Sequence, residues 1–167
     1  LHDALPIYTD ISFDHTDLDA VYCDGESVTS QIRTPEVSRA VSIVASYVGV
    51  REHLVDIQRI EAAKGYVVMD GRDIGTTVLP DADIKIFLTA STQERALRRF
   101  QEISTKGIKV TYQEVLNDIE NRDRLDSERE HSPLRPAEDS IIIDTTQLSI
   151  EEVVQKIVSL VRAQLIM

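Results

Sequence analysis

Short apolar runs alternate along this chain with stretches of helical periodicity. The runs occupy residues 66–69, 84–88 and 141–143, and each is too short for a helix but typical of a buried parallel strand. The stretches between and after them carry apolar residues every three to four positions, as on one face of a helix. Strands that alternate with helices at this spacing predict an α/β fold with a parallel sheet.

The first part of the chain predicts a β-hairpin followed by two helices. Polar and apolar residues alternate over 11–28, and Asp24-Gly25 is a typical hairpin turn. The first helix, 34–46, begins at a Thr-Pro pair, which is typical of an N-cap followed by the first helical position. The second helix, 50–64, is followed by a glycine. The apolar positions predict one buried face on each helix.

Three capping boxes mark later helix starts. In each box, at residues 91–94, 111–114 and 149–152, a Ser or Thr precedes a Glu by three positions. The first two boxes predict a pair of helices separated by Lys106-Gly107, and the third predicts a final helix.

Composition narrows the classes of protein. The chain has 167 residues, 42% of them hydrophobic, which is enough for one globular domain. Its formal net charge of −11 argues against general binding to nucleic acid or membrane surfaces. The single cysteine, Cys23, excludes a disulfide framework, and no apolar run reaches transmembrane length. We therefore expect a cytoplasmic protein, and any polyanionic ligand must be met by a local basic cluster.

A cluster of acid, arginine and glycine follows the run at 66–69. Ligands of open α/β sheets bind beyond the carboxyl ends of the strands, where Asp70, Arg72 and Asp73 are expected to emerge. Glycines at positions 71 and 75 would let the backbone approach a ligand closely. The alternative is an ordinary turn with solvated charges.

The helix after Thr111 has an unusual inward face. Residues at helical spacing begin apolar and end in charge, which would be costly to bury without partners. We interpret this face as the wall of a polar cleft in which guanidinium groups bind phosphate. The alternative is a helix that projects past the core with an internal Arg122–Asp126 pair. The face comprises Tyr112, Val115, Ile119, Arg122, Asp126 and Arg129.

Arg95, Arg98 and Arg99 lie on one side of the helix after Ser91. Cations in this arrangement suit phosphoryl transfer, whose transition state is stabilised mainly by electrostatics. A solvated basic face is the more common meaning of such a run.

Together these motifs resemble those of bacterial cytidylate kinase. The matching segments are residues 32–38, 70–76, 85–91 and 122–129, within a resemblance that runs from about residue 11 to the C-terminus. The resemblance implies a P-loop kinase fold with a three-layer parallel sheet, a β-hairpin and helical insert that binds the nucleoside monophosphate, and a helical lid. It implies transfer of the γ-phosphoryl group of ATP to CMP or dCMP with Mg²⁺, by a protein that is monomeric at full length.

The resemblance also implies roles for individual residues. Ser42, Arg51 and Asp73 match cytosine-recognising positions, and Asp126 with Arg122 matches the ribose contact. Arg72, Arg122 and Arg129 match phosphate contacts and transfer-site residues. Asp70 would hold Mg²⁺ through water. The lid residues Arg95, Arg98 and Arg99 would close over ATP, with Arg95 and Arg99 acting in catalysis, and Thr145 and Thr146 would lie near the adenine.

The chain departs from the family at its start, because the phosphate-loop motif G-x-x-x-x-G-K-[ST] occurs nowhere in it. We therefore expect an N-terminally truncated kinase that lacks the first strand and the P-loop and is inactive by itself. Alternatives are a non-catalytic nucleotide-binding fragment and another small-molecule P-loop kinase. The expected regions are a non-native remnant (1–7), the acceptor-binding region (8–65) and the core (66–167) with its lid (91–131).

Overall fold

The computed structural model describes residues 9–14 and 20–165, and the chain in it divides into two compact units. Unit 1 comprises the chain up to Asp70 together with Leu125–Pro133, and unit 2 comprises Gly71–Arg124 and Leu134–Met167. The expected remnant at 1–7 lies outside the described residues. The expected division into acceptor-binding region, core and lid is a functional one and stays a prediction.

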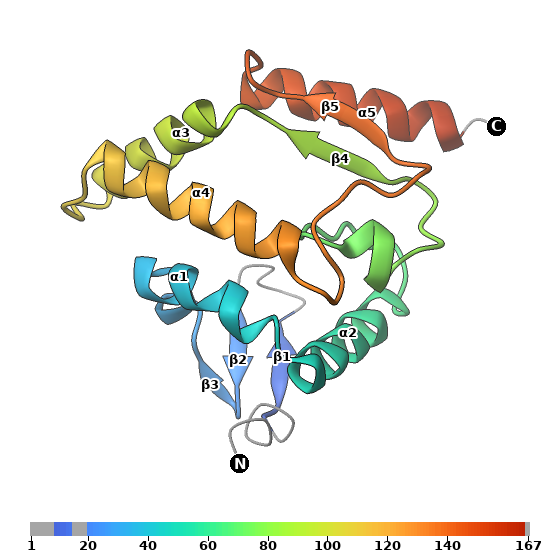
Figure 1. Cartoon of the computed structure of the whole chain (residues 1–167). Helices are drawn as coiled ribbons and strands as arrows, with labels where there is room; N and C mark the ends of the chain where they lie inside the picture. The colour runs from blue at the N-terminus through green and yellow to red at the C-terminus, as the bar shows by residue number, and fades with distance from the viewer. Residues whose placement is uncertain (1–8, 15–19, 166–167) are drawn as a thin grey trace. The chain divides into compact units, whose positions relative to one another are not determined.

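Unit 1 contains a small antiparallel sheet of three strands in the order β1-β2-β3 (Figure 1). The strands are β1 (Ile11–Phe13), β2 (Val21–Cys23) and β3 (Glu26–Ser27). Asp24 and Gly25 form the β2–β3 turn, with φ of 51° and 80°, and Cys23 pairs with Glu26 across it. Two consecutive positive φ angles are typical of a type I′ hairpin turn, so the predicted hairpin is confirmed.

The two helices of unit 1 are α1 (Pro35–Val44) and α2 (Val48–Ala62). The Thr34 hydroxyl accepts a hydrogen bond from the Val37 amide at 3.3 Å, which confirms the predicted N-cap. Gly65 ends the second segment with φ of 90°, a conformation that favours glycine.

The predicted buried faces of these helices are only partly correct. On α1, Val41 and Val44 are exposed, whereas the polar Ser42 is buried. On α2, Val55 is buried but Ile60 is 63% exposed. Periodicity marks the apolar positions of a helix, but only the packing partners decide which of them are covered.

Unit 2 contains a parallel pair of strands, β4 (Ile86–Thr89) and β5 (Ile141–Asp144). Helix α5 (Ile150–Leu165) follows β5 and runs back alongside it (Figure 1). A reciprocal capping box begins α5: Ser149 N donates to Glu152 at 2.8 Å, and Glu152 N donates to Ser149 Oγ at 3.2 Å. The predicted α/β class with a parallel sheet is confirmed. The residues of α5 that are not exposed include Val153, Ile157, Leu160 and Val161.

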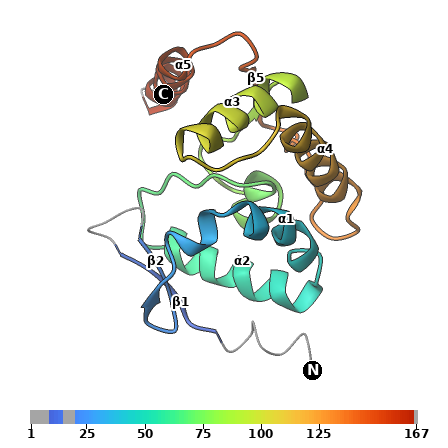
Figure 2. The same cartoon turned by 90° about the vertical axis from the view of Figure 1, so that its left-hand side faces the viewer.

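The helices α3 (Thr92–Thr105) and α4 (Tyr112–Glu128) pack side by side within unit 2 (Figure 2). Ala96, Ile103 and Val115 form their buried core, and Phe100 of α3 meets the Tyr112 ring edge-on, with centroids 6.3 Å apart. Both helices begin at their predicted caps, although Ser91 N donates to Thr146 instead of closing a box with Glu94.

The prediction of a buried strand at residues 66–69 is wrong. These residues form no strand; Tyr66 has a φ of 49°, and Val68 is 100% exposed. A strand exists only where a neighbouring strand pairs with it, and within the described residues none pairs with this segment. An apolar run therefore shows a capacity for strand formation, not a strand.

None of the helices described in the structure is both long and apolar enough to cross a membrane.

Candidate functional site

Arg51, Asp126 and Arg129 form a charged cluster in unit 1. The pKa of the Arg51 guanidinium is lowered, mainly by burial and then by the positive charge of Arg129, while the Asp126 carboxylate opposes the shift. Asp126 is 2% exposed. Two guanidinium groups close enough to repel each other, with one buried carboxylate nearby, are an arrangement that can attract an anionic ligand.

Ser42 is buried in the same unit, at 6% exposure, on α1. Its hydroxyl oxygen is buried, and no partner for a hydrogen bond exists within the described residues. Buried hydroxyl groups are nearly always hydrogen-bonded, so this oxygen is available to a bound ligand. Unit 1 therefore combines a cationic cluster with an unsatisfied polar group.

The inward face predicted for α4 agrees with the pattern of burial. Val115 and Asp126 are buried, and Arg122 is half-buried between them. The predicted extent is wrong at one point, because the helix ends at Glu128 and Arg129 lies just beyond it. The Arg129 Nε group donates to the Ser132 carbonyl, which orients the side chain where the helix no longer does.

Asp73 is the N-cap of a π-helical turn, Ile74–Val78. The Asp73 carbonyl accepts hydrogen bonds from Thr77 N at 2.8 Å and Val78 N at 3.3 Å. Asp73 is 5% exposed, and Val78 is almost fully buried. The turn fixes the backbone of Asp73, and such turns occur frequently at functional sites. Arg72, the preceding residue of unit 2, is exposed.

The glycines of this turn pack closely against neighbouring side chains. A Cβ atom at Gly71 would lie 2.8 Å from Ile74 Cγ1, and one at Gly75 would lie 3.3 Å from Lys85 Cδ. Lys85 in turn donates to the Asp139 carboxylate at 2.6 Å. These close contacts are with the protein itself, and the expected close approach of the backbone to a ligand stays a prediction.

Arg95 is held by the protein on several sides. Its Nη1 and Nη2 groups donate to Asp123 Oδ1 and Oδ2 at 3.0 and 2.6 Å, and its Nε group donates to the Ala90 carbonyl at 3.2 Å. This bidentate pair ties α3 to α4. The helical spacing of the arginines in α3 indicated a functional role for Arg95. No nearby residue in the sequence indicated that its partner would be Asp123.

Arg98 and Arg99 point to different partners. Arg98 donates to Glu94 and to the turn after β5, and Arg99 donates to Glu102 Oε2 at 2.7 Å. Each arginine of this group is therefore ion-paired or hydrogen-bonded, but Arg98 is also exposed, so these contacts do not contradict the alternative of a solvated basic face.

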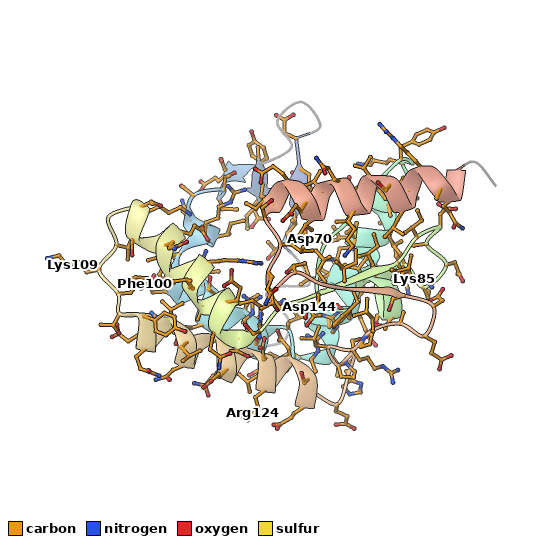
Figure 3. All side chains as sticks on the ribbon, turned by 90° about the horizontal axis from the view of Figure 1, so that it is seen from above. Asp70, Lys85, Phe100, Lys109, Arg124 and Asp144 are labelled. Atoms are coloured by element: carbon orange, nitrogen blue, oxygen red, sulfur yellow. The ribbon has the colours of Figure 1, made fainter. Side chains whose placement is uncertain are left out.

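The carboxyl ends of β4 and β5 meet in a hydrogen-bonded turn. Thr146 Oγ1 donates to Asp144 Oδ1 at 2.6 Å and accepts from Ser91 N at 3.0 Å. The pKa of Asp144 is lowered first by the hydrogen bond from the Thr146 hydroxyl and then by the hydrogen bond from the Thr146 amide. Thr145 is buried, and its hydroxyl donates to the Thr89 carbonyl at 3.0 Å. The predicted adenine-site residues are thus part of an ordered turn, with Asp144 at the strand end (Figure 3).

Two further features bear on ligand binding. Within the described residues no group of three or more His, Cys, Asp or Glu side chains is arranged to hold a metal ion.

A hollow of about 440 Å³ lies at the α3–α4 turn, where Lys109 projects outward (Figure 3). Its lining includes Ile108 and Thr111 but no predicted site residue.

Comparison with known proteins identifies the family. The sequence profile of cytidylate kinase matches residues 3–163. The cytidylate kinase of Desulfitobacterium hafniense is 57% identical over 152 residues, which cover 91% of this chain and 66% of that protein. The cytidylate kinases of Bacillus licheniformis and Bacillus subtilis are 57% and 55% identical over 141 residues, which cover 84% of this chain and 62% and 63% of those proteins. The chain thus spans slightly less than two thirds of these relatives, and it belongs to the cytidylate kinase family.

Proposed function

We propose that this chain carries the acceptor site of a kinase that transfers the γ-phosphoryl group of ATP to CMP or dCMP. Family membership supports the reaction class, and the family has the P-loop kinase fold. The observation that carries the proposal is the cluster of Arg51, Asp126 and Arg129 in unit 1. The same unit also buries the unsatisfied Ser42 hydroxyl.

An acceptor phosphate is an anion that this cluster would attract. Arg51 and Arg129 repel each other, so a phosphate bound at Arg129 offsets part of that unfavourable interaction. In this proposal Arg129 and Arg72 bind phosphate, while Arg51 contacts the cytosine. The Asp126 carboxylate accepts from the ribose hydroxyl groups, and Arg122 donates to them. Each assignment follows the residue's match to the family motif.

Cytosine is distinguished from uracil by its exocyclic amine, which donates hydrogen bonds where uracil has an acceptor. Ser42 and Asp73 provide oxygen acceptors of the kind that this amine requires. The π-helical turn fixes the backbone of Asp73, which limits the positions that its carboxylate can take before the nucleotide binds. A site with fixed acceptors rejects a base that presents an acceptor in place of a donor.

The donor side of the reaction involves the other predicted residues. Arg95 and Arg99 are the proposed electrostatic groups for the transferred phosphoryl, and the turn at Thr145 and Thr146 is the proposed adenine contact. Asp70 is exposed and offers the oxygen donor that Mg²⁺ prefers, and a single carboxylate acting through water is sufficient when phosphates supply the other ligands. Bound Mg²⁺ would neutralise charge on the phosphates of ATP.

The proposal is tested by acceptor selectivity in the longest natural chain that contains these residues. ATP-dependent ADP release is measured with CMP, dCMP, UMP and AMP as acceptors. We expect CMP and dCMP to be used with the highest kcat/KM. Asp73→Asn should lower kcat/KM for CMP by about 100-fold or more while changing the weak activity on UMP far less, because the lost pairing concerns only cytosine.

A matched control is Asp81→Asn, which removes the same charge from an exposed position near the turn and should leave both activities unchanged. Equal losses on CMP and UMP in Asp73→Asn would mean that Asp73 does not read the base. Preference for a different acceptor by the wild-type protein would contradict the proposed function itself.

A further inference from the structure

Arg98 is hydrogen-bonded to both ends of the turn that connects β5 to α5. Its Nη2 group donates to the Thr145 carbonyl at 2.7 Å and to the Leu148 carbonyl at 3.4 Å, and its Nη1 group donates to Thr145 Oγ1 at 3.3 Å. Its Nε group donates to Glu94 Oε1 at 2.8 Å. One side chain therefore joins α3 to a turn about 50 residues further along the chain.

Besides the hydrogen bonds that Thr146 makes with Asp144 and Ser91, the turn has two backbone hydrogen bonds that involve Thr145. Leu148 N donates to the Thr145 carbonyl at 3.1 Å, and Thr145 N donates to the Thr89 carbonyl at 2.7 Å. The Thr145 carbonyl thus accepts from both Leu148 and Arg98. Thr145 is 6% exposed, and loss of the guanidinium would leave its carbonyl with one partner fewer. Among the described residues, Arg98 is the only side chain of another element that donates to both Thr145 and Leu148, the two ends of the turn.

The position of this turn gives the contact a consequence for function. It follows the carboxyl end of β5, where open α/β sheets bind their ligands. We propose that Arg98 is a positioning residue: it fixes the turn at 145–148 for the adenine end of ATP and does not contact the nucleotide. The inference rests on the proposed kinase function, and it departs from the expected role of Arg98 as a lid cation.

The guanidinium group suits this role better than an ammonium group. Its planar fork donates in several fixed directions, so it can bind Glu94, the Thr145 hydroxyl and two carbonyls at once. A lysine would keep the charge but could not reproduce these directions. Arg98→Lys therefore separates positioning, which needs the fork, from attraction of the ATP phosphates, which needs only the charge.

The structural half of the proposal is tested in the 167-residue chain by amide hydrogen exchange. Arg98→Met and Arg98→Lys should both increase the exchange rate of the Thr145 and Leu148 amides by about tenfold, because each loses the fork that closes the turn. Lys106→Met is the control: it removes a cation from the end of the same helix, where Lys106 pairs with Glu102, and it should leave these amides unchanged.

The functional half is tested by steady-state kinetics in the longest natural chain that contains these residues. Arg98→Met and Arg98→Lys should raise the KM for ATP by about tenfold while kcat and the KM for CMP change less than about twofold. Lys106→Met should leave all three constants unchanged. A role limited to stability would lower the melting temperature without separating the two KM values.

Each other outcome overturns the proposal. Unchanged exchange at the Thr145 and Leu148 amides would show that Arg98 does not hold the turn, and an unchanged KM for ATP would show that the turn does not position the donor. Rescue of the KM by lysine would make Arg98 a phosphate-binding cation. If the wild-type protein transfers no phosphoryl group, the proposed function fails, and the exchange comparison still shows separately whether Arg98 holds the turn.

Discussion

Arg95 on α3 and Asp123 on α4 form a bidentate ion pair, with donor–acceptor distances of 3.0 and 2.6 Å. Both side chains are about one third exposed. The pair lies beside the apolar contacts of Ala96, Ile103 and Val115, so it adds a fixed orientation to the packing of the two helices. A group predicted to act on ATP thus also has a structural partner.

The first prediction concerns the strength of this pair. A double-mutant cycle of Arg95→Met and Asp123→Asn, measured by chemical denaturation, should give a coupling free energy of about 1–2 kcal/mol, because the pair is bidentate and partly buried. The exposed Lys106–Glu102 pair, treated in the same way, should give about 0.3–0.5 kcal/mol. Equal coupling in the two pairs would contradict a special role for Arg95 and Asp123 in helix packing.

The second prediction concerns the corrected segment at 66–69. Val78→Ala should lower the free energy of unfolding by about 2 kcal/mol, because Val78 is 1% exposed. Val68→Ala should change it by less than about 0.5 kcal/mol, because Val68 is fully exposed. Urea denaturation of both variants measures the difference. A comparable loss in Val68→Ala would mean that this segment is a buried strand after all.

Local sequence signals predicted local structure well. The hairpin at Asp24-Gly25, the N-cap at Thr34 and the capping box at Ser149 depend on residues at most three positions apart, so the sequence contains everything that determines them. The prediction of a strand at residues 66–69 failed because a strand is not determined by local sequence alone. A strand depends on a partner elsewhere in the fold, and the apolar run itself says nothing about that partner.

In the candidate site, too, the sequence predicted local features but not contacts between distant residues. Helical spacing predicted that Arg122 and Asp126 share the inward face of α4, and the pattern of burial agrees. It could not predict that Arg95 pairs with Asp123, or that Arg98 reaches Thr145, because these contacts join residues 28 and 47 positions apart. Motif resemblance identified the arginines as a group, but only tertiary structure separates their roles.

The third prediction concerns pH. A hydrogen bond from Lys85 is the main reason that the pKa of Asp139 is lowered below its ordinary value of about 3.9. The folded state therefore favours the charged form. The Lys85–Asp139 interaction stabilises the folded protein at pH values above the pKa that Asp139 has in the unfolded chain. This stabilisation is lost as the pH falls through the lower pKa that Asp139 has in the folded protein. The melting temperatures of the wild type and Asp139→Asn should differ at neutral pH and converge in acid; a difference that grows in acid would contradict this assignment.

The most direct test of the acceptor site is calorimetric titration of the 167-residue chain with CMP. Arg51→Met should weaken binding by about tenfold or more, because it removes the guanidinium group that is proposed to contact the cytosine. Arg39→Met, which removes an exposed cation that pairs with Glu36 on α1, should bind CMP as the wild type does. Wild-type affinity for CMP in Arg51→Met, with a preserved melting temperature, would contradict the assignment of this cluster to the acceptor nucleotide.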